Sequence, residues 1–194
     1  MSVTTQTLQG AVLSITSNVL AQAISAYQSN SPFSLNFPKV FTFALFSVLS
    51  NPPNIFWQSF LEDQFPTNVR ASTSPSAAEK QAEQPNPTRT TLSKTNVLIK
   101  FLLDQTLGAL VNTLMFIAYT SYVNNTQSIA QGQSPWEAVK SDCGAKTWPM
   151  MKDGYKFWPA ISLVSFLWVP VEKRVVFGCS VGVIWGIYLS LAAE

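Results

Sequence analysis

The sequence contains no histidine and only two cysteines, and these absences exclude several kinds of site. A zinc centre built from cysteine and histidine is excluded, because Cys143 and Cys179 lie far apart and neither belongs to a Cys-x-x-Cys motif. A serine or cysteine triad of the usual kind would need a histidine base, and no glycine-rich phosphate loop is present. We therefore expect no enzymatic activity, no metal and no cofactor.

Charge is also scarce. Only 11% of the 194 residues are charged, whereas about a quarter is usual in a soluble domain. The net charge is +2 and the basic residues are scattered, so no stripe suited to nucleic acid is present. A helix needs about 20 mostly apolar residues to cross a hydrocarbon core of about 30 Å. Five stretches contain no charged residue: 1–38, 40–61, 105–136, 157–171 and 175–193. The composition predicts a protein whose partner is the lipid bilayer.

These stretches predict an all-α fold, a polytopic membrane helix bundle of about four transmembrane helices plus an interfacial amphipathic helix. The number of spans within 157–193 stays open, because 157–171 is short. A helix should begin at Pro135, with Ser134 as N-cap, and should end near Trp148. We expect it to lie at the membrane interface, because its tryptophans are mixed with lysine and aspartate. The predicted spans are 8–27, 38–61 with Pro52 and Pro53 inside it, 97–123, and the stretch 175–193.

The chain divides into three regions by composition. Residues 1–65 hold the first two spans, and residues 66–94 are rich in proline, serine and alanine, which predicts a flexible loop. Residues 95–194 hold span 3, the interfacial helix and the C-terminal helices. The loop holds or borders the largest group of lysines and arginines, which the positive-inside rule assigns to the cytosol. Four lysines between 140 and 156 weaken this orientation.

Two polar stripes run along otherwise apolar spans. Such stripes either line a hydrated path or hold helices together, since amides between helices contribute about 0.6 kcal/mol each. From the stripes alone we favour packing over a pore. The stripe residues recur every four positions: Ser14, Asn18 and Gln22 in the first span, and Asp104, Gly108 and Asn112 in the third.

Asp104 lies well inside an apolar stretch and therefore needs a partner. Lys100, one turn earlier, could neutralise it by reaching toward water. Arg174 is the sharper candidate, because the cluster Glu172-Lys173-Arg174 should lie at the same depth and its guanidinium can hold a carboxylate together with a helix-end carbonyl. We predict a buried Asp104–Arg174 ion pair, supported by Gln105.

Three glycines in the last apolar stretch form two consecutive Gly-x-x-x-Gly steps: Gly178, Gly182 and Gly186. Small residues at this spacing allow two helix backbones to approach closely. The partner helix could belong to the same chain or to a second copy, which would give a homo-oligomer.

The last third of the chain also carries a recognisable set of residues: Trp158, Pro159, Phe166, Val169, Pro170, Arg174, Trp185, Tyr188, Leu189 and Ser190. Their order and spacing resemble the signature of the peroxisomal membrane protein 22 kDa family, also called the Mpv-seventeen family, of small multi-span organelle proteins. Further similarity lies in Gln22, in Pro52 with Trp57, and in the pair Asp104-Gln105. The resemblance covers most of the chain outside 66–94.

Several positions depart from the family pattern: Asn18 replaces Asp, Asn51 Gly, Ile55 His, Gln58 Tyr, Leu110 Pro, Ser162 Gln and Ser165 Asn. With the long loop, these departures resemble the fungal peroxisomal branch more than the mitochondrial inner-membrane branch. The resemblance implies a pore or channel that passes small solutes across the peroxisomal membrane. The alternatives are a membrane scaffold without transport activity, and a location in the mitochondrial inner membrane.

Overall fold

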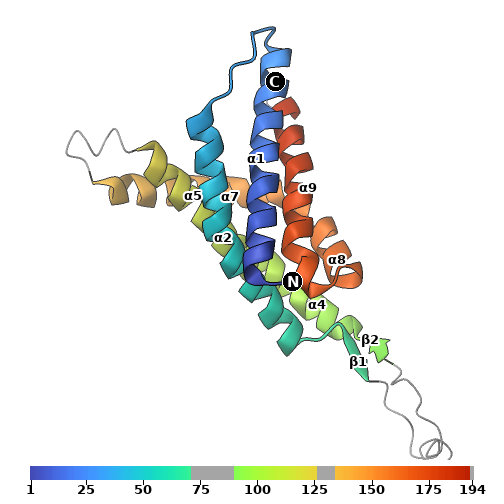
Figure 1. Cartoon of the computed structure of the whole chain (residues 1–194). Helices are drawn as coiled ribbons and strands as arrows, with labels where there is room; N and C mark the ends of the chain where they lie inside the picture. The colour runs from blue at the N-terminus through green and yellow to red at the C-terminus, as the bar shows by residue number, and fades with distance from the viewer. Residues whose placement is uncertain (71–89, 126–133, 193–194) are drawn as a thin grey trace, which may run out of the picture.

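The computed structural model describes residues 1–70, 90–125 and 134–192, with the backbone alone after residue 185. It is an all-α arrangement, apart from one short strand pair at its lower end (Figure 1). The elements are α1 Val3–Gln28, α2 Phe37–Gln64, β1 Asn68–Arg70, β2 Thr90–Leu92, α4 Lys94–Leu103, the π-helix η1 Asp104–Gly108, α5 Ala109–Asn124, α7 Pro135–Gly154, α8 Trp158–Trp168 and α9 Val171–Ala192.

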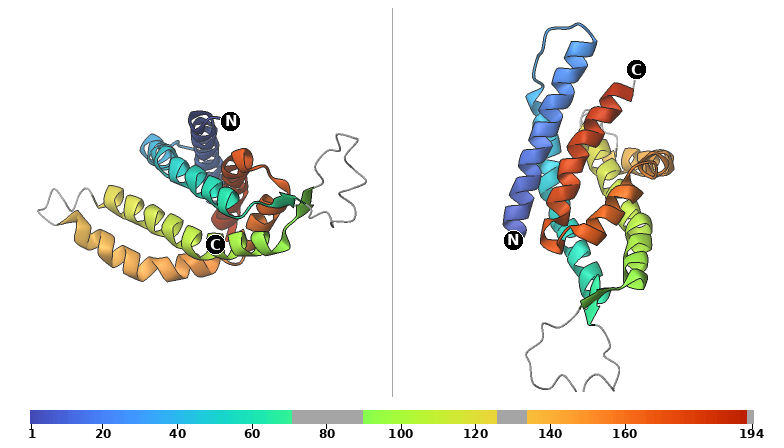
Figure 2. Two further views of the ribbon diagram at one scale, coloured as in Figure 1. Left: turned by 90° about the horizontal axis from the view of Figure 1, so that it is seen from below. Right: turned by 90° about the vertical axis from the view of Figure 1, so that its right-hand side faces the viewer.

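Helix α1 packs against both α2 and α9, and the three run side by side (Figure 1; Figure 2). The helix begins where the Ser2 hydroxyl accepts a hydrogen bond from the Thr5 amide, and it ends before Asn30, which adopts a positive φ of 48°. Helix α2 begins after Asn36, whose side chain caps the Lys39 amide. These boundaries agree with the predicted spans 8–27 and 38–61.

The third predicted span is one continuous helical rod from residue 94 to 124. By length and composition, it is the one helix in the described part of the chain that is long and apolar enough to cross a membrane. The prediction of four spans is therefore not confirmed. The middle of this helical rod is the π-helix η1, whose turn holds one residue more than a turn of α-helix. Nothing in the polar stripe Asp104, Gly108 and Asn112 signalled this change of geometry.

The two ends of the predicted loop 66–94 are ordered. Asn68 pairs with Leu92 and Arg70 with Thr90 in an antiparallel register, and the Ser93 amide donates to the Thr67 carbonyl. The prediction of a flexible loop was wrong for these segments, since they form backbone hydrogen bonds between the helix ends. Residues 71–89 lie outside the described residues.

Helix α7 runs roughly perpendicular to α1, α2 and α9 and lies along α5 (Figure 1; Figure 2). It is longer than the predicted helix, which ended near Trp148. Trp136 and Trp148 are exposed on it. Helix α8 has 11 residues, so its length is about 17 Å, which is too short to cross a hydrocarbon core of about 30 Å. Helix α9 starts directly after Pro170, four residues before the predicted stretch 175–193.

The described hydrophobic core is small and lies near the strand pair. Leu61 of α2, Val97 of α4 and Phe166 of α8 are buried against one another. Trp57, Phe101, Leu103 and Leu167 pack around them. This cluster fixes the lower ends of three helices relative to each other.

Close backbone packing occurs at other glycines than predicted. A Cβ atom on Gly178 or Gly182 would meet nothing within 4 Å, so these glycines do not pack closely against another helix of the described chain. Gly10 does: a Cβ there would overlap the Asn51 amide nitrogen and lie 3.2 Å from Cys179 Sγ. The close approach between α1, α2 and α9 therefore depends on a glycine in α1.

Gly10→Ala should lower the free energy of unfolding by about 1–3 kcal/mol, because the added methyl group overpacks the contact with Asn51. Gly178→Ala is the matched control and should be neutral or slightly stabilising, since alanine is the better helix former. Thermal unfolding of both variants in detergent measures the difference. Equal destabilisation of the two variants would contradict the close packing at Gly10. It would favour a second copy of the chain that packs against Gly178.

Candidate functional site

The polar and apolar residues of the described chain are distributed inside out. Ten polar or charged residues are buried, against eight hydrophobic ones. Large hydrophobic side chains, among them Phe41, Phe56 and Ile184, are exposed along the helices. A soluble protein of this size does not expose so many large apolar side chains. The polar groups that could form a functional site therefore lie in the interior of the bundle.

A polar stripe on α2 faces this interior. It was not predicted from the sequence, although its residues recur at the helical spacing of four, three and four: Ser47, Asn51, Asn54 and Gln58. The Asn51 amide donates to Ser47 Oγ at 3.0 Å, and Cys179 Sγ lies 3.7 Å from Asn51 Oδ1. Asn51 thus joins α2 to α9 beside Gly10 of α1.

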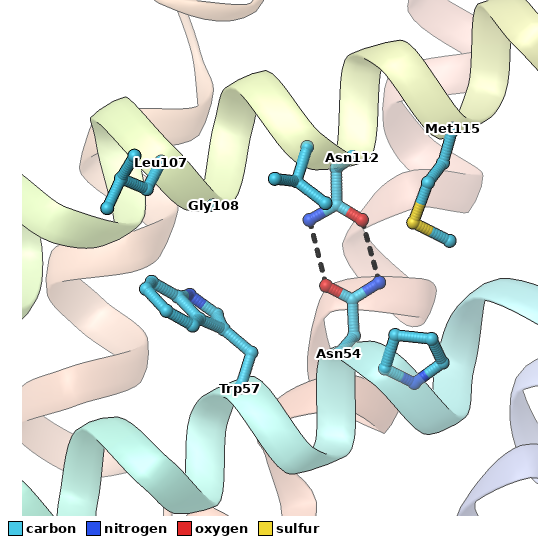
Figure 3. Close-up of a pocket in the computed structure, with 8 residues that line it drawn as sticks. Asn54, Trp57, Leu107, Gly108, Asn112 and Met115 are labelled. Atoms are coloured by element: carbon cyan, nitrogen blue, oxygen red, sulfur yellow. Dashed lines mark hydrogen bonds between the residues drawn. The ribbon is translucent and has the colours of Figure 1, made fainter.

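Asn54 and Asn112 form a reciprocal amide pair between α2 and α5 (Figure 3). The two hydrogen bonds are 2.7 and 2.8 Å long, and Asn54 also donates to the Ser50 carbonyl. The pair lines a cavity of about 170 Å³ that Trp57, Leu107 and Met115 also border. Asn112, a predicted pore-lining or packing residue, is therefore bonded to the neighbouring helix.

Asp104 of η1 is held by four side chains. Ser162 Oγ donates to Oδ2 at 2.7 Å and Gln105 Nε2 donates to the same atom at 3.3 Å. Gln58 Nε2 and Trp57 Nε1 donate to Oδ1 at 3.1 and 3.3 Å. The predicted support from Gln105 is present. Gly108 allows this approach, because a Cβ there would lie 2.9 Å from Trp57 Nε1.

The prediction that Arg174 pairs with Asp104 was wrong. Arg174 Nη2 lies 2.8 Å from Glu62 Oε2, and Lys100 Nζ lies 2.6 Å from the same oxygen. The argument from depth placed Arg174 at the correct end of the bundle, but it omitted Glu62, which stands one residue beyond the charge-free stretch 40–61. Asp104 is satisfied by neutral donors and needs no cation.

We call Glu62, Thr67, Lys100 and Arg174 the charge cluster. The Thr67 hydroxyl accepts from Lys100 Nζ and donates to Glu62 Oε2, and the Thr67 amide donates to Glu62 Oε1 at 2.8 Å. Arg174 Nε donates to the Val169 carbonyl at 3.1 Å. Both cations also lie over the Phe166 ring, at 5.3 and 5.1 Å from its centroid. The charge cluster therefore connects α2, α4, α8 and α9.

The predicted stripe on α1 bonds to α2 and to the turn before it. Ser14 Oγ donates to the Phe43 carbonyl at 3.0 Å. Gln22 donates to Asn18 Oδ1 and accepts from the Asn36 amide, each at 2.7 Å. These contacts have the geometry of helix packing. The structure thus places the predicted polar residues in separate groups along the bundle.

The predicted family signature forms contacts at both ends of α8. Phe157 stacks on Trp185 with ring centroids 4.9 Å apart, and Trp158 lies edge-on to both. Phe166 is buried and Val169 binds Arg174. Only the backbone is described after residue 185, so no contacts are given for Gly186, Tyr188, Leu189 and Ser190. Within that described portion, no group of three or more Cys, Asp or Glu could hold a metal ion.

Comparison with known proteins confirms the predicted resemblance. Residues 128–190 match the Mpv17 / PMP22 family. It is 25% identical to Protein sym1 of Schizosaccharomyces pombe over 96% of this chain and 82% of sym1. It is 29% identical to the Mpv17-like protein of Bos taurus over 50% of this chain and 45% of that protein. The Peroxisomal membrane protein PMP22 of Arabidopsis thaliana is 28% identical over 49% of this chain and 46% of that protein.

No solved structure matches this chain. The relatives confirm the predicted resemblance and support a membrane localisation. Apart from sym1, the alignments span less than half of the length of the curated relatives named here.

The amide pair predicts non-additive mutations. Asn54→Leu or Asn112→Leu alone should destabilise the protein by about 0.6 to 1.7 kcal/mol, because each leaves one amide unpaired. The double variant should lose less than the sum of the two. Unfolding in detergent of the two single variants and the double variant measures this coupling; strictly additive losses would mean that the amides do not stabilise each other.

The charge cluster predicts a loss of stability in acid. Glu62 lies directly after the predicted span 38–61. Burial raises the pKa of its carboxyl group, but the hydrogen bonds from Lys100, the Thr67 amide and Arg174 outweigh this effect and lower the pKa from 4.5 to about 2. The stabilisation is therefore present above pH 4.5 and is lost as the pH falls toward about 2. The melting temperature of Glu62→Gln should depend less on pH in this window than that of the wild type. Parallel profiles would show that Glu62 does not titrate there.

Proposed function

We propose that this protein is an integral protein of an organelle membrane whose helix bundle passes small solutes. The observation that supports the proposal is the inside-out distribution of polarity. Exposed apolar side chains suit a hydrocarbon solvent, in which they cost nothing to expose. Buried serine, asparagine, glutamine and charged side chains within such a bundle often mark solute or ion routes.

The polar interior that supports passage lies between α1, α2 and α9. Asn51, Ser47 and Ser50 of α2 are buried there, and Gln6 of α1 is 3% exposed. The Gln6 Oε1 atom is buried and has no hydrogen-bond partner in the structure, so the polar groups of this region are not all consumed by packing. We infer that a passage would run beside Gln6 of α1, where a buried polar atom is unpaired, rather than along the stripe Ser14, Asn18 and Gln22.

A membrane scaffold without transport activity is the second candidate. It is favoured by a specific observation: the side chains of Ser14, Gln22 and Asn112 all bind neighbouring elements. Side chains used in this way hold helices together and do not need a solute. Exposed surfaces, such as the open face at Gly178 and Gly182, would then receive a second copy or another membrane protein.

We propose the peroxisomal membrane as the location, with the mitochondrial inner membrane as the alternative. The support is the similarity to a protein named Peroxisomal membrane protein PMP22. Imaging of the tagged chain against markers of both organelles tests the location. Mitochondrial labelling would replace the first location with the second.

Conductance of the purified protein in planar bilayers tests the proposed passage. We expect current above the lipid background, and we expect Gln6→Leu to reduce it severalfold, because the substitution removes a buried polar group from the proposed path. Leu8→Ala is the matched control on the same helix, since Leu8 is 61% exposed, and it should leave the current unchanged.

Folded and inserted wild-type protein that gives no current would remove the pore and leave the scaffold. Current that is insensitive to Gln6→Leu but abolished by the triple change Asn18→Leu, Gln22→Leu and Asn112→Leu would move the path to the stripes predicted from the sequence. Each variant should first be shown to insert, so that a loss of folding is not mistaken for a loss of conductance.

A further inference from the structure

The charge cluster holds more positive than negative charge. Lys100 is 0% exposed and Arg174 is 5% exposed, and both bind one oxygen of a single carboxylate, Glu62 Oε2. The neighbouring acids Asp63 and Glu172 are exposed, and neither forms an ion pair within the described residues. Two buried cations therefore share one anion. A buried charge without a counter-ion is strongly unfavourable.

The cluster also has hydrogen-bond donors without acceptors. Arg174 Nη1 is buried and has no hydrogen-bond partner among the described groups, although Nε and Nη2 are both used. Lys100 Nζ carries three protons and binds two acceptors, Glu62 and Thr67. The Phe166 ring lies under both cations but offers only its π-face. The excess charge and the spare donors therefore occur at the same place.

We propose that the charge cluster binds a phosphate group, held by Arg174 Nη1 and Lys100 Nζ. A tetrahedral oxyanion supplies both the missing charge and several acceptor atoms, and arginine is suited to phosphate because its N–H donors form a rigid planar fork that can bind two phosphate oxygens. The side chain of Glu62 is 23% exposed, so the cluster reaches the surface of the chain on that side. The inference goes beyond the proposed passage and does not depend on it.

The phosphate could belong to a phospholipid headgroup or to a soluble phosphate compound. The cluster lies where α2 ends and α9 begins, next to the strand pair (Figure 1). Trp168, 72% exposed, stands near this end, which is typical of a residue at the membrane surface. A lipid headgroup and a soluble phosphate compound would both present the same oxyanion at the membrane surface. The two arms of the experiment below distinguish them.

Thermal unfolding with inorganic phosphate, against chloride at matched ionic strength, tests the site in neutral detergent. At tenfold excess over the dissociation constant, a wild-type melting temperature raised by about 3–5 °C is expected. A second arm compares bilayers of phosphatidylcholine containing phosphatidic acid with bilayers of phosphatidylcholine alone. A shift in the first arm assigns a soluble phosphate compound, and a shift in the second arm alone assigns the headgroup.

Three variants make the test specific. Arg174→Gln leaves one cation with one carboxylate, so it should fold and lose the phosphate shift. Lys173→Gln removes the same charge from the exposed neighbouring residue and should keep it. Glu62→Gln leaves two cations without an acid and should show a larger shift than the wild type. Absence of a shift in both arms, or an equal shift in Arg174→Gln and the wild type, would overturn the proposal.

Discussion

The carboxylate of Glu62 is the contact on which the lower half of the bundle depends. Glu62 lies in the last turn of α2, and its carboxylate receives Lys100 from α4 and Arg174 from α9, while Thr67 links it to the strand pair. An ion pair buried away from water is stable only when its remaining hydrogen bonds are also made. Three segments that are distant in sequence, around residues 62–67, 100 and 174, must therefore arrive together, which gives the junction a single arrangement.

Away from this junction, helix contacts are made by neutral amides and hydroxyls. The pairs Asn54–Asn112 and Gln22–Asn36, and the Ser14–Phe43 contact, each join two elements that expose apolar side chains on their other faces. In hydrocarbon, apolar side chains gain little by contacting one another, so polar contacts and close approach must hold the helices together. The same groups would be available to a solute only where they are not already paired, as at Gln6.

The helices could be predicted because charge-free stretches and proline positions determine where a chain can remain in lipid. The partners of individual side chains could not. Arg174 was assigned to Asp104 because of their matching depth, but Glu62 also stands directly beside a charge-free stretch, so position in the sequence could not decide between the two acids. The α2 stripe with Asn51 and Asn54 has the same spacing as the stripe on α1 and could have been found. The spacing of Gly178 and Gly182 was typical of packing, but spacing does not show what faces a helix.

The π-helix at Asp104–Gly108 changes the rotational phase of span 3. Successive residues of an α-helix are about 100° apart, and one additional residue in a turn offsets the two halves by about that angle. Helix α4 can therefore direct Lys100 toward Glu62 while α5 directs Asn112 toward Asn54, which a uniform helix would present with a different relative rotation. Span 3 behaves as two helices joined end to end, and a single helical wheel cannot describe which of its faces meets lipid.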